Sequence, residues 1–124
     1  MISFEKAKAL KKCECVQWEP KEGDCYYLPK GDGPYLLVGE TLEGVGKECI
    51  AAHGTFAPRL DQLLAEIERR GWWWDLECVT SYYICVLYKN LPGGHMHPDF
   101  EADTPEDAAA DALLWILKEA NQWT

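Results

Sequence analysis

The strongest hydrophobic pattern lies in the C-terminal half of the chain, where helical periodicity gives way to strand-like runs and then returns. A first helix is predicted over about residues 57–70, because apolar residues recur at helical spacing between Pro58 and Gly71. They are Leu60, Leu63, Leu64 and Ile67. A second helix is predicted over residues 104–121, because Thr104 can cap its first turn and an apolar stripe follows. Two helices therefore enclose a central segment of different periodicity.

Three strand-like runs lie between the two helices. In the first run, alternation places Asp75 and Glu77 on the side that faces water. The opposite side of this run would carry Trp72, Trp74, Leu76 and Cys78. The second run, residues 82–88, is apolar on both faces, which is typical of a central strand, and the turn at 90–94 leads into a third run at 95–102. The pattern predicts an α+β fold with an α-β-β-β-α core, in which both helices pack against a mainly antiparallel sheet.

The N-terminal half is rich in Gly and Pro, and the elements predicted in it are short. Ser3 can cap a helix from Phe4 to about Lys12, and an alternating run follows from Cys13 to Trp18. Further extended runs are predicted at 25–28, 35–38 and 48–52. We therefore expect one domain over residues 1–124, in which residues 1–55 are a β-rich extension of the sheet with a helix and a short hairpin, and residues 56–124 are the core.

The charge balance restricts the partners that the chain can bind. Twelve basic and 21 acidic residues give a formal net charge of −9. An acidic surface repels phosphate backbones and anionic membranes, so direct nucleic-acid binding and membrane association are disfavoured. No run approaches the ~20 apolar residues of a membrane helix, and the first residues lack the apolar core of a signal peptide. We expect a cytoplasmic protein of a bacterial host whose acidic surface either confers solubility or contacts a basic partner.

Cysteine and histidine residues provide one candidate for metal chemistry. The two pairs Cys13/Cys15 and His95/His97 each place two potential ligands on one face of a strand, so a four-ligand zinc site could form if the strands were neighbours. Zinc ligands more often follow a C-x₂₋₄-C spacing from a turn, and the alternative is two exposed histidines with partly buried thiols. The six cysteines are otherwise expected to be reduced, and most of them to fill the core.

Catalytic patterns are weak throughout the sequence. The glycines around residues 31–34 lack the further glycines and the following helix of a phosphate-binding loop. The carboxylates are scattered and no nucleophile lies beside a base, so no catalytic residue and no cofactor is predicted. We expect a protein that is not an enzyme.

The aromatic cluster around residues 72–74 provides the best candidate for binding. A sheet face covered by the two helices would account for most of these side chains, but alternation turns Trp73 and one of the following tyrosines, Tyr83, outward. An exposed Trp beside acidic residues is typical of an interface hot spot, so Trp73, Tyr83, Asp75 and Glu77 are the predicted partner-binding residues. This hypothesis requires an exposed Trp or Tyr in an apolar patch bordered by Asp and Glu.

The order of elements, with Asp107-Ala-Ala-Ala-Asp-Ala-Leu-Leu in the last helix, resembles the outline of a double-stranded-RNA-binding domain. That family places a lysine cluster at the start of its last helix. Here the matching stretch, Glu101-Ala-Asp-Thr-Pro-Glu-Asp, is acidic throughout, so the resemblance extends to the outline and not to RNA binding.

Residues 57–122 also resemble the phage ABA sandwich domain family, small phage and prophage proteins of unknown function. The resemblance rests on Leu60-Asp-Gln-Leu-Leu-Ala-Glu-Ile-Glu-Arg-Arg-Gly, a Trp-rich strand, a hairpin, and Ala102-Asp-Thr-Pro-Glu-Asp-Ala-Ala-Ala-Asp-Ala-Leu-Leu. It implies a prophage-type protein and supplies no catalytic residues. A further likeness, of Thr104-Pro-Glu-Asp-Ala to the helix start of HicB-type antitoxins, implies toxin blocking by acidic contacts, without that family's DNA-binding tail.

Together these features predict a phage- or prophage-type accessory protein, a non-catalytic acidic module that binds a protein with a basic surface. A nucleic-acid-mimicking or antitoxin-like inhibitor is the alternative of the same class. A small zinc-binding protein or enzyme using His95, His97 and nearby thiols is the alternative of a different class. Both a monomer and a homodimer are compatible with the sequence.

Overall fold

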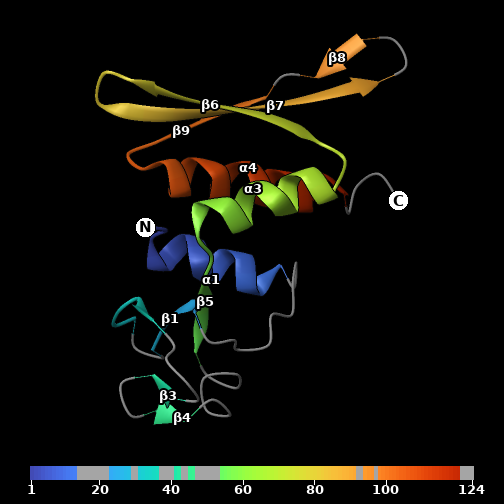
Figure 1. The fold of residues 1–124 in the computed structure, drawn as a ribbon. Helices are drawn as coiled ribbons and strands as arrows, with labels where there is room; N and C mark the ends of the chain where they lie inside the picture. The colour runs from blue at the N-terminus through green and yellow to red at the C-terminus, as the bar shows by residue number, and fades with distance from the viewer. Residues whose placement is uncertain are drawn as a thin grey trace.

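The helices and strands of the protein stack in three layers (Figure 1). The computed structural model describes residues 1–13, 23–28, 31–36, 41–42, 45–46, 54–91, 94–96 and 98–120. An antiparallel sheet forms the first layer, helices α3 (Leu60–Arg69) and α4 (Pro105–Ala120) form the second, and helix α1 (Phe4–Lys12) lies beneath them beside a smaller sheet. The α+β class predicted from the sequence is confirmed.

The larger sheet is built around one long strand. Strand β7 (Tyr82–Leu91) pairs with β6 (Trp73–Val79) on one side and with β9 (Asp99–Ala102) and β8 (Gly94–Met96) on the other, always antiparallel. The predicted central position of this strand is therefore correct. The single run predicted at 95–102 is instead two strands, because Pro98 between them has no N–H to continue the ladder of hydrogen bonds. The Pro98 carbonyl still accepts a hydrogen bond from Leu87 N at 2.9 Å.

Two residues with left-handed backbone conformation form the turns before and after β6. Gly71, with φ +89°, lies directly after α3 and turns the chain into β6, as a residue without a Cβ readily does. Thr80, with φ 54°, lies in the two-residue connection between β6 and β7, where hairpin turns require positive φ. Both turns are short, so β6 packs against both α3 and β7, its neighbours in the sequence.

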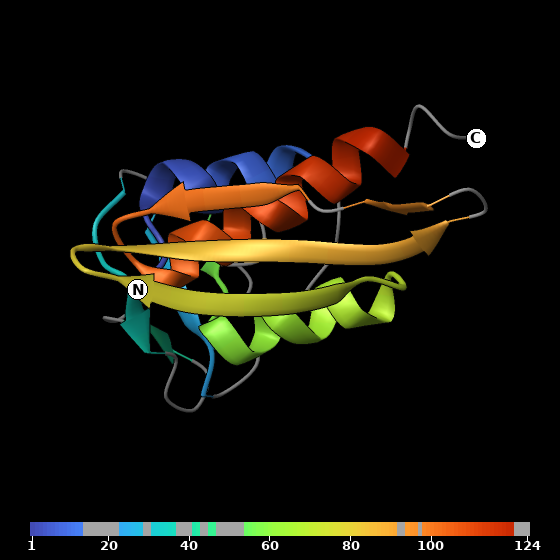
Figure 2. The same ribbon diagram turned by 90° about the horizontal axis from the view of Figure 1, so that it is seen from above.

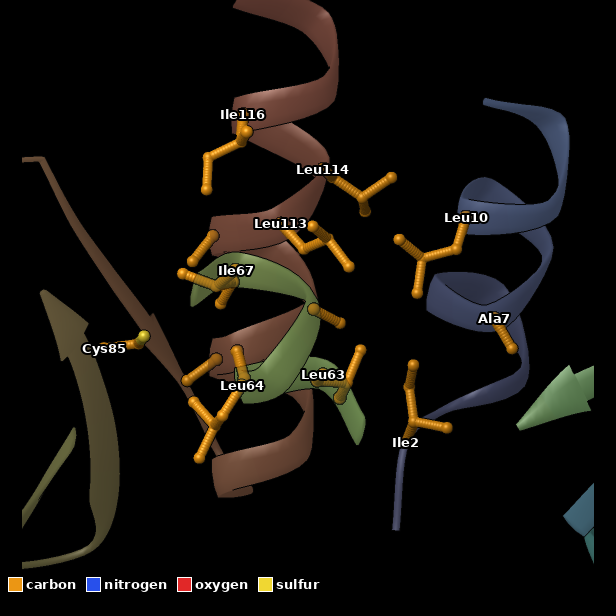
Figure 3. Close-up of a cluster of buried hydrophobic side chains, with 14 of the residues drawn as sticks. Ile2, Ala7, Leu10, Leu63, Leu64, Ile67, Cys85, Leu113, Leu114 and Ile116 are labelled. Carbon is orange, nitrogen blue, oxygen red and sulfur yellow. The ribbon is translucent and has the colours of Figure 1, made fainter. Parts of the chain in front are cut away.

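Helix α4 is buried on two sides because it lies between the sheet and α1 (Figure 3). Its start is capped by Thr104, whose Oγ1 accepts a hydrogen bond from Asp107 N at 3.2 Å. Its fully or nearly buried residues are Ala108, Ala109, Ala110, Ala112, Leu113, Leu114, Ile116 and Leu117. The small residues come first and the large ones later, which lets the first turns of α4 approach neighbouring elements closely.

Polar contacts fix α1 against α4. Ser3 caps α1 through its Oγ, which accepts a hydrogen bond from Lys6 N at 3.3 Å, and Ser3 N donates to Asp107 Oδ1 at 2.8 Å. The Lys6 ammonium also forms an ion pair with Asp111 one turn further along α4. The predicted bounds and cap of α1 are confirmed. Its buried residues Ala7 and Leu10, together with Ile2 just before the helix, belong to the same cluster as Leu113 (Figure 3).

The N-terminal strands do not extend the larger sheet, contrary to the prediction. Strand β1 (Cys25–Tyr27) pairs with β2 (Tyr35–Leu36) and with β5 (Thr55–Ala57) in a separate three-stranded sheet, and β3 (Thr41–Leu42) pairs with β4 (Val45–Gly46). The sequence does not predict strand β5, because it places Pro58 within the following helix. Pro58 instead precedes the helix cap Arg59 and favours an extended conformation in the residue before it, which completes β5. The runs predicted at 14–18, 37–38 and 48–52 lie outside the described residues.

Within the described residues, no helix has both the length and the apolar character needed to span a bilayer.

Candidate functional site: the outer face of the sheet

All of the described helices lie on one side of the larger sheet. Seen from above, β6, β7 and β9 lie in front of the helices, and no described element covers them (Figure 2). Cys85 and Leu87 of β7 are fully buried on the helix side, and Cys85 points from the sheet toward the helices (Figure 3). Because side chains alternate along a strand, the residues between them face away from the helices. We call this second side the outer face.

The outer face carries an apolar stripe along its central strand. The stripe consists of Tyr82, Ile84, Val86 and Tyr88, all of them partly exposed. In a sheet covered on both sides such residues would be fully buried, as Cys85 and Leu87 are. The stripe is therefore a row of core-like side chains that the described residues leave uncovered.

Carboxylates border the apolar stripe on both sides. In register across the three strands, Glu77 and Glu101 flank Ile84, and Asp75 and Asp99 flank Val86. These four acidic residues are exposed, and we call the pair on each edge strand an acidic row. None of the outward positions described on β6, β7 and β9 carries a Lys or Arg. The outer face thus combines an apolar centre with a single sign of charge at its borders.

An aromatic pair closes one end of the stripe. Trp73 is 73% exposed and lies directly opposite Tyr88 in the register of β6 and β7. Burial raises the pKa of the Tyr88 phenol, and the carboxylates of Asp75 and Glu77 raise it further; Asp75 also accepts a hydrogen bond from it. This hydrogen bond links the Tyr88 phenol to the Asp75 carboxylate, two residues along β6 from the exposed indole of Trp73. This arrangement has the exposed Trp, apolar patch and acidic border that the binding hypothesis requires.

The other aromatic residues of this region contact the helix layer. Trp72 stacks edge-on against Trp115 of α4 with ring centroids 5.4 Å apart, and the Lys89 ammonium lies 4.9 Å from the centroid of Trp72. Trp74 Nε1 donates to Glu68 Oε1 of α3 at 2.8 Å. These side chains have the structural role that the sequence offered as the alternative for the cluster.

Tyr83 is not on the outer face, which corrects its predicted orientation. It pairs with Cys78 and Ala102 in register and packs against the main core cluster on the helix side. The negative charge of the Cys78 sulfur when it is ionised, and a hydrogen bond with Cys78, raise the pKa of Tyr83, with smaller contributions from burial and Glu106. The outward tyrosines are Tyr82 and Tyr88, both of which belong to the stripe. Of the four predicted partner-binding residues, Trp73, Asp75 and Glu77 lie together on the outer face.

The candidate metal ligands lie on different elements. Cys13 is the C-cap of α1 and not part of a strand, whereas His95 belongs to β8, on the far side of the α3–α4 layer from α1 (Figure 1). Cys15 and His97 fall outside the described residues. Among the residues that the structure does describe, no group of three or more His, Cys, Asp or Glu side chains could hold a metal ion.

The thiols of β6 and β7 differ in accessibility and acidity. Cys78 is exposed, whereas Cys85 is fully buried, and burial together with the charge of Asp75 raises the pKa of Cys85 to about 11. At pH 8 a thiol of this pKa is ionised in about one molecule per thousand. We expect iodoacetamide at pH 8 to label Cys78 and to leave Cys85 unlabelled in the native protein, as measured by peptide mass spectrometry. Unfolding in urea should make both reactive; equal labelling of the two in native protein would contradict the buried position of Cys85.

Comparison with known proteins provides no further constraint on the site. No protein-family profile matches the chain, and neither the curated proteins nor the solved structures contain a significant match.

Sequence reasoning identified the β6 part of the outer face and missed the rest. The sequence places Asp99 and Glu101 only within a strand-like run, and it places the stripe residues in a central strand that is apolar on both faces. The signal that could have found them is the alternation Asp99-Phe100-Glu101-Ala102, which puts two carboxylates on one side of an edge strand.

Proposed function

We propose that the protein is a non-catalytic binding module that docks on a basic surface of another protein through its outer face. The observation that carries this proposal is the uncovered apolar stripe with carboxylates on both sides and Trp73 at one end. Uncovered apolar stripes bordered by charged residues are typical of interaction sites. Burial of the apolar centre against a partner favours binding, and the charges at the border determine which partner binds.

The composition of the outer face favours docking over pure charge mimicry. A nucleic-acid mimic presents carboxylates in place of phosphates, whereas here the centre of the face is apolar and aromatic. The exposed Trp73 supplies the kind of side chain that dominates binding energy when a partner buries it. The phage or prophage setting enters the proposal only through the resemblance of residues 57–122 to the ABA sandwich family.

Trp73→Ala tests the proposal. The tagged protein and this variant are used to capture partners from bacterial lysate, and the bound species are compared by quantitative mass spectrometry. We expect the unmodified chain to retain at least one basic protein and to lose it at raised salt. Trp73→Ala should reduce the captured amount of that protein about tenfold or more, because truncating a Trp hot spot costs about 2 kcal/mol or more.

Leu36→Ala is the matched control for this experiment. Leu36 is also an exposed large apolar residue, 55% exposed, but it belongs to β2 in the smaller sheet. The control should retain the partner as the unmodified chain does. Equal retention by Trp73→Ala, or equal loss with Leu36→Ala, would count against the outer face as the docking surface.

A further inference from the structure

The dimensions of the outer face indicate which kind of secondary structure in a partner protein fits against it. This inference rests on the proposed docking function. Neighbouring strands lie about 4.8 Å apart, so the acidic rows on β6 and β9 are separated by about 10 Å. An α-helix with its side chains is about 10 Å wide. One helix laid along β7 would therefore cover the apolar stripe and place its two flanks over the two acidic rows.

The length of the stripe also corresponds to a helix. From Tyr82 to Tyr88 the strand advances six residues, about 20 Å at 3.3 Å per residue. About 13 residues of α-helix span the same distance at 1.5 Å each, which is between three and four turns. Such a helix presents an apolar stripe of its own at i, i+3 or i+4, and i+7, with room for basic side chains on both sides of it.

The charges of the outer face exclude a symmetric contact in which the outer faces of two copies of this chain pack together. Two outer faces placed together would bring eight carboxylates into one interface, and the outward positions described on this face include no Lys or Arg to offset them. A strand added to the edge of β6 would also leave the stripe on β7 uncovered. Long Lys and Arg side chains, in contrast, can lie along apolar surface while their charged ends reach the acidic rows.

We infer that the outer face binds a basic amphipathic helix of the partner, laid along β7, with its apolar stripe on Ile84 and Val86 and its Lys or Arg residues over the two acidic rows. Trp73, at the end of the stripe, lies where a basic side chain of that helix can contact the indole face.

Two synthetic peptides of equal composition test this inference. The first is an amphipathic helix of about 14 residues with a Leu stripe flanked on both sides by Lys; the second is scrambled so that Leu is spread around the helix. Fluorescence anisotropy of the labelled peptides gives the affinity of each. We expect the amphipathic peptide to bind about tenfold or more tightly than the scrambled one, because only the first can bury apolar side chains and pair its charges together.

The double variant Ile84→Thr with Val86→Thr removes apolar contacts while keeping β-branched side chains in the strand. It should bring the two peptides to nearly equal affinity, with circular dichroism used to check that it remains folded. Trp73→Ala, at a position 73% exposed, provides a second variant, which should also lower the preference for the amphipathic peptide.

The outcomes separate this inference from the proposed function. Equal affinity of the two peptides, with both lost when the carboxylates of the outer face are neutralised, would overturn the helix inference and leave an acidic docking face. Affinities that no outer-face variant changes would overturn both.

Discussion

Neutralising the four carboxylates of the outer face is expected to weaken binding of a basic partner by about tenfold to a hundredfold. The variant is Asp75→Asn, Glu77→Gln, Asp99→Asn and Glu101→Gln. Exposed ion pairs contribute about 0.2–1 kcal/mol each, so four lost together cost about 0.8–4 kcal/mol, and the expected decrease lies in the middle of that range. The salt dependence of binding should fall as well, because the charges that salt screens are gone. Isothermal titration at two ionic strengths measures both effects.

A control with the same net charge separates local from overall electrostatics. This control removes four exposed carboxylates that lie on α1, on α3 and in the loop between β1 and β2. Its substitutions are Glu5→Gln, Asp32→Asn, Asp61→Asn and Glu68→Gln. This variant should bind the partner with nearly unchanged affinity. If both variants weaken binding equally, the net charge of −9 and not the outer face attracts the partner.

The second large effect concerns stability and tests the position of α4 between two layers. Leu113 is fully buried in the main cluster, where α4 contacts both the sheet and α1 (Figure 3). Leu113→Ala is expected to lower the free energy of unfolding by about 3–5 kcal/mol, because the truncation removes apolar contacts and leaves a cavity. That is a large share of the roughly 5–15 kcal/mol typical of a domain. Urea unfolding followed by circular dichroism measures the loss.

Leu36→Ala again provides the comparison, because Leu36 is 55% exposed and its truncation should change stability by less than about 0.5 kcal/mol. A loss below about 1 kcal/mol for Leu113→Ala would show that α4 is not enclosed on both sides. The outer face would then lose its rigid support, because α4 is the element that packs against β7 and β9.

The parts of the fold that local signals determine were predictable. Helix α1 begins and ends where its Ser3 cap and its apolar spacing indicated, and Trp73 faces outward as alternation along β6 required. In both cases the physical cause lies within a few residues of the feature. Strand β5 could not be found in this way, because Pro58 is equally typical of a first helical turn, so the sequence predicts a helix from residue 57 where the structure has the end of a strand that pairs with β1.

On the outer face, the orientation of the β6 residues was predictable from the sequence, but the orientation of the β7 residues was not. Between Tyr82 and Tyr88 the strand is apolar at every position in both alternations, so its sequence does not say which set of side chains faces the helices. That choice places Tyr83 inward and leaves Tyr82 and Ile84 in the stripe. It depends on which residues of β7 lie opposite Trp73, Asp75 and Glu77 of β6, a cross-strand register that the apolar run itself does not encode.

The measurement that tests the central claim most directly is an NMR titration of the ¹⁵N-labelled protein with the amphipathic basic peptide. Our account predicts that amide shifts change along β6, β7 and β9, most strongly around Trp73, Ile84 and Val86, while those of α1 and the smaller sheet stay in place. Shift changes concentrated on α1 or on the smaller sheet would contradict the assignment of the outer face as the binding surface.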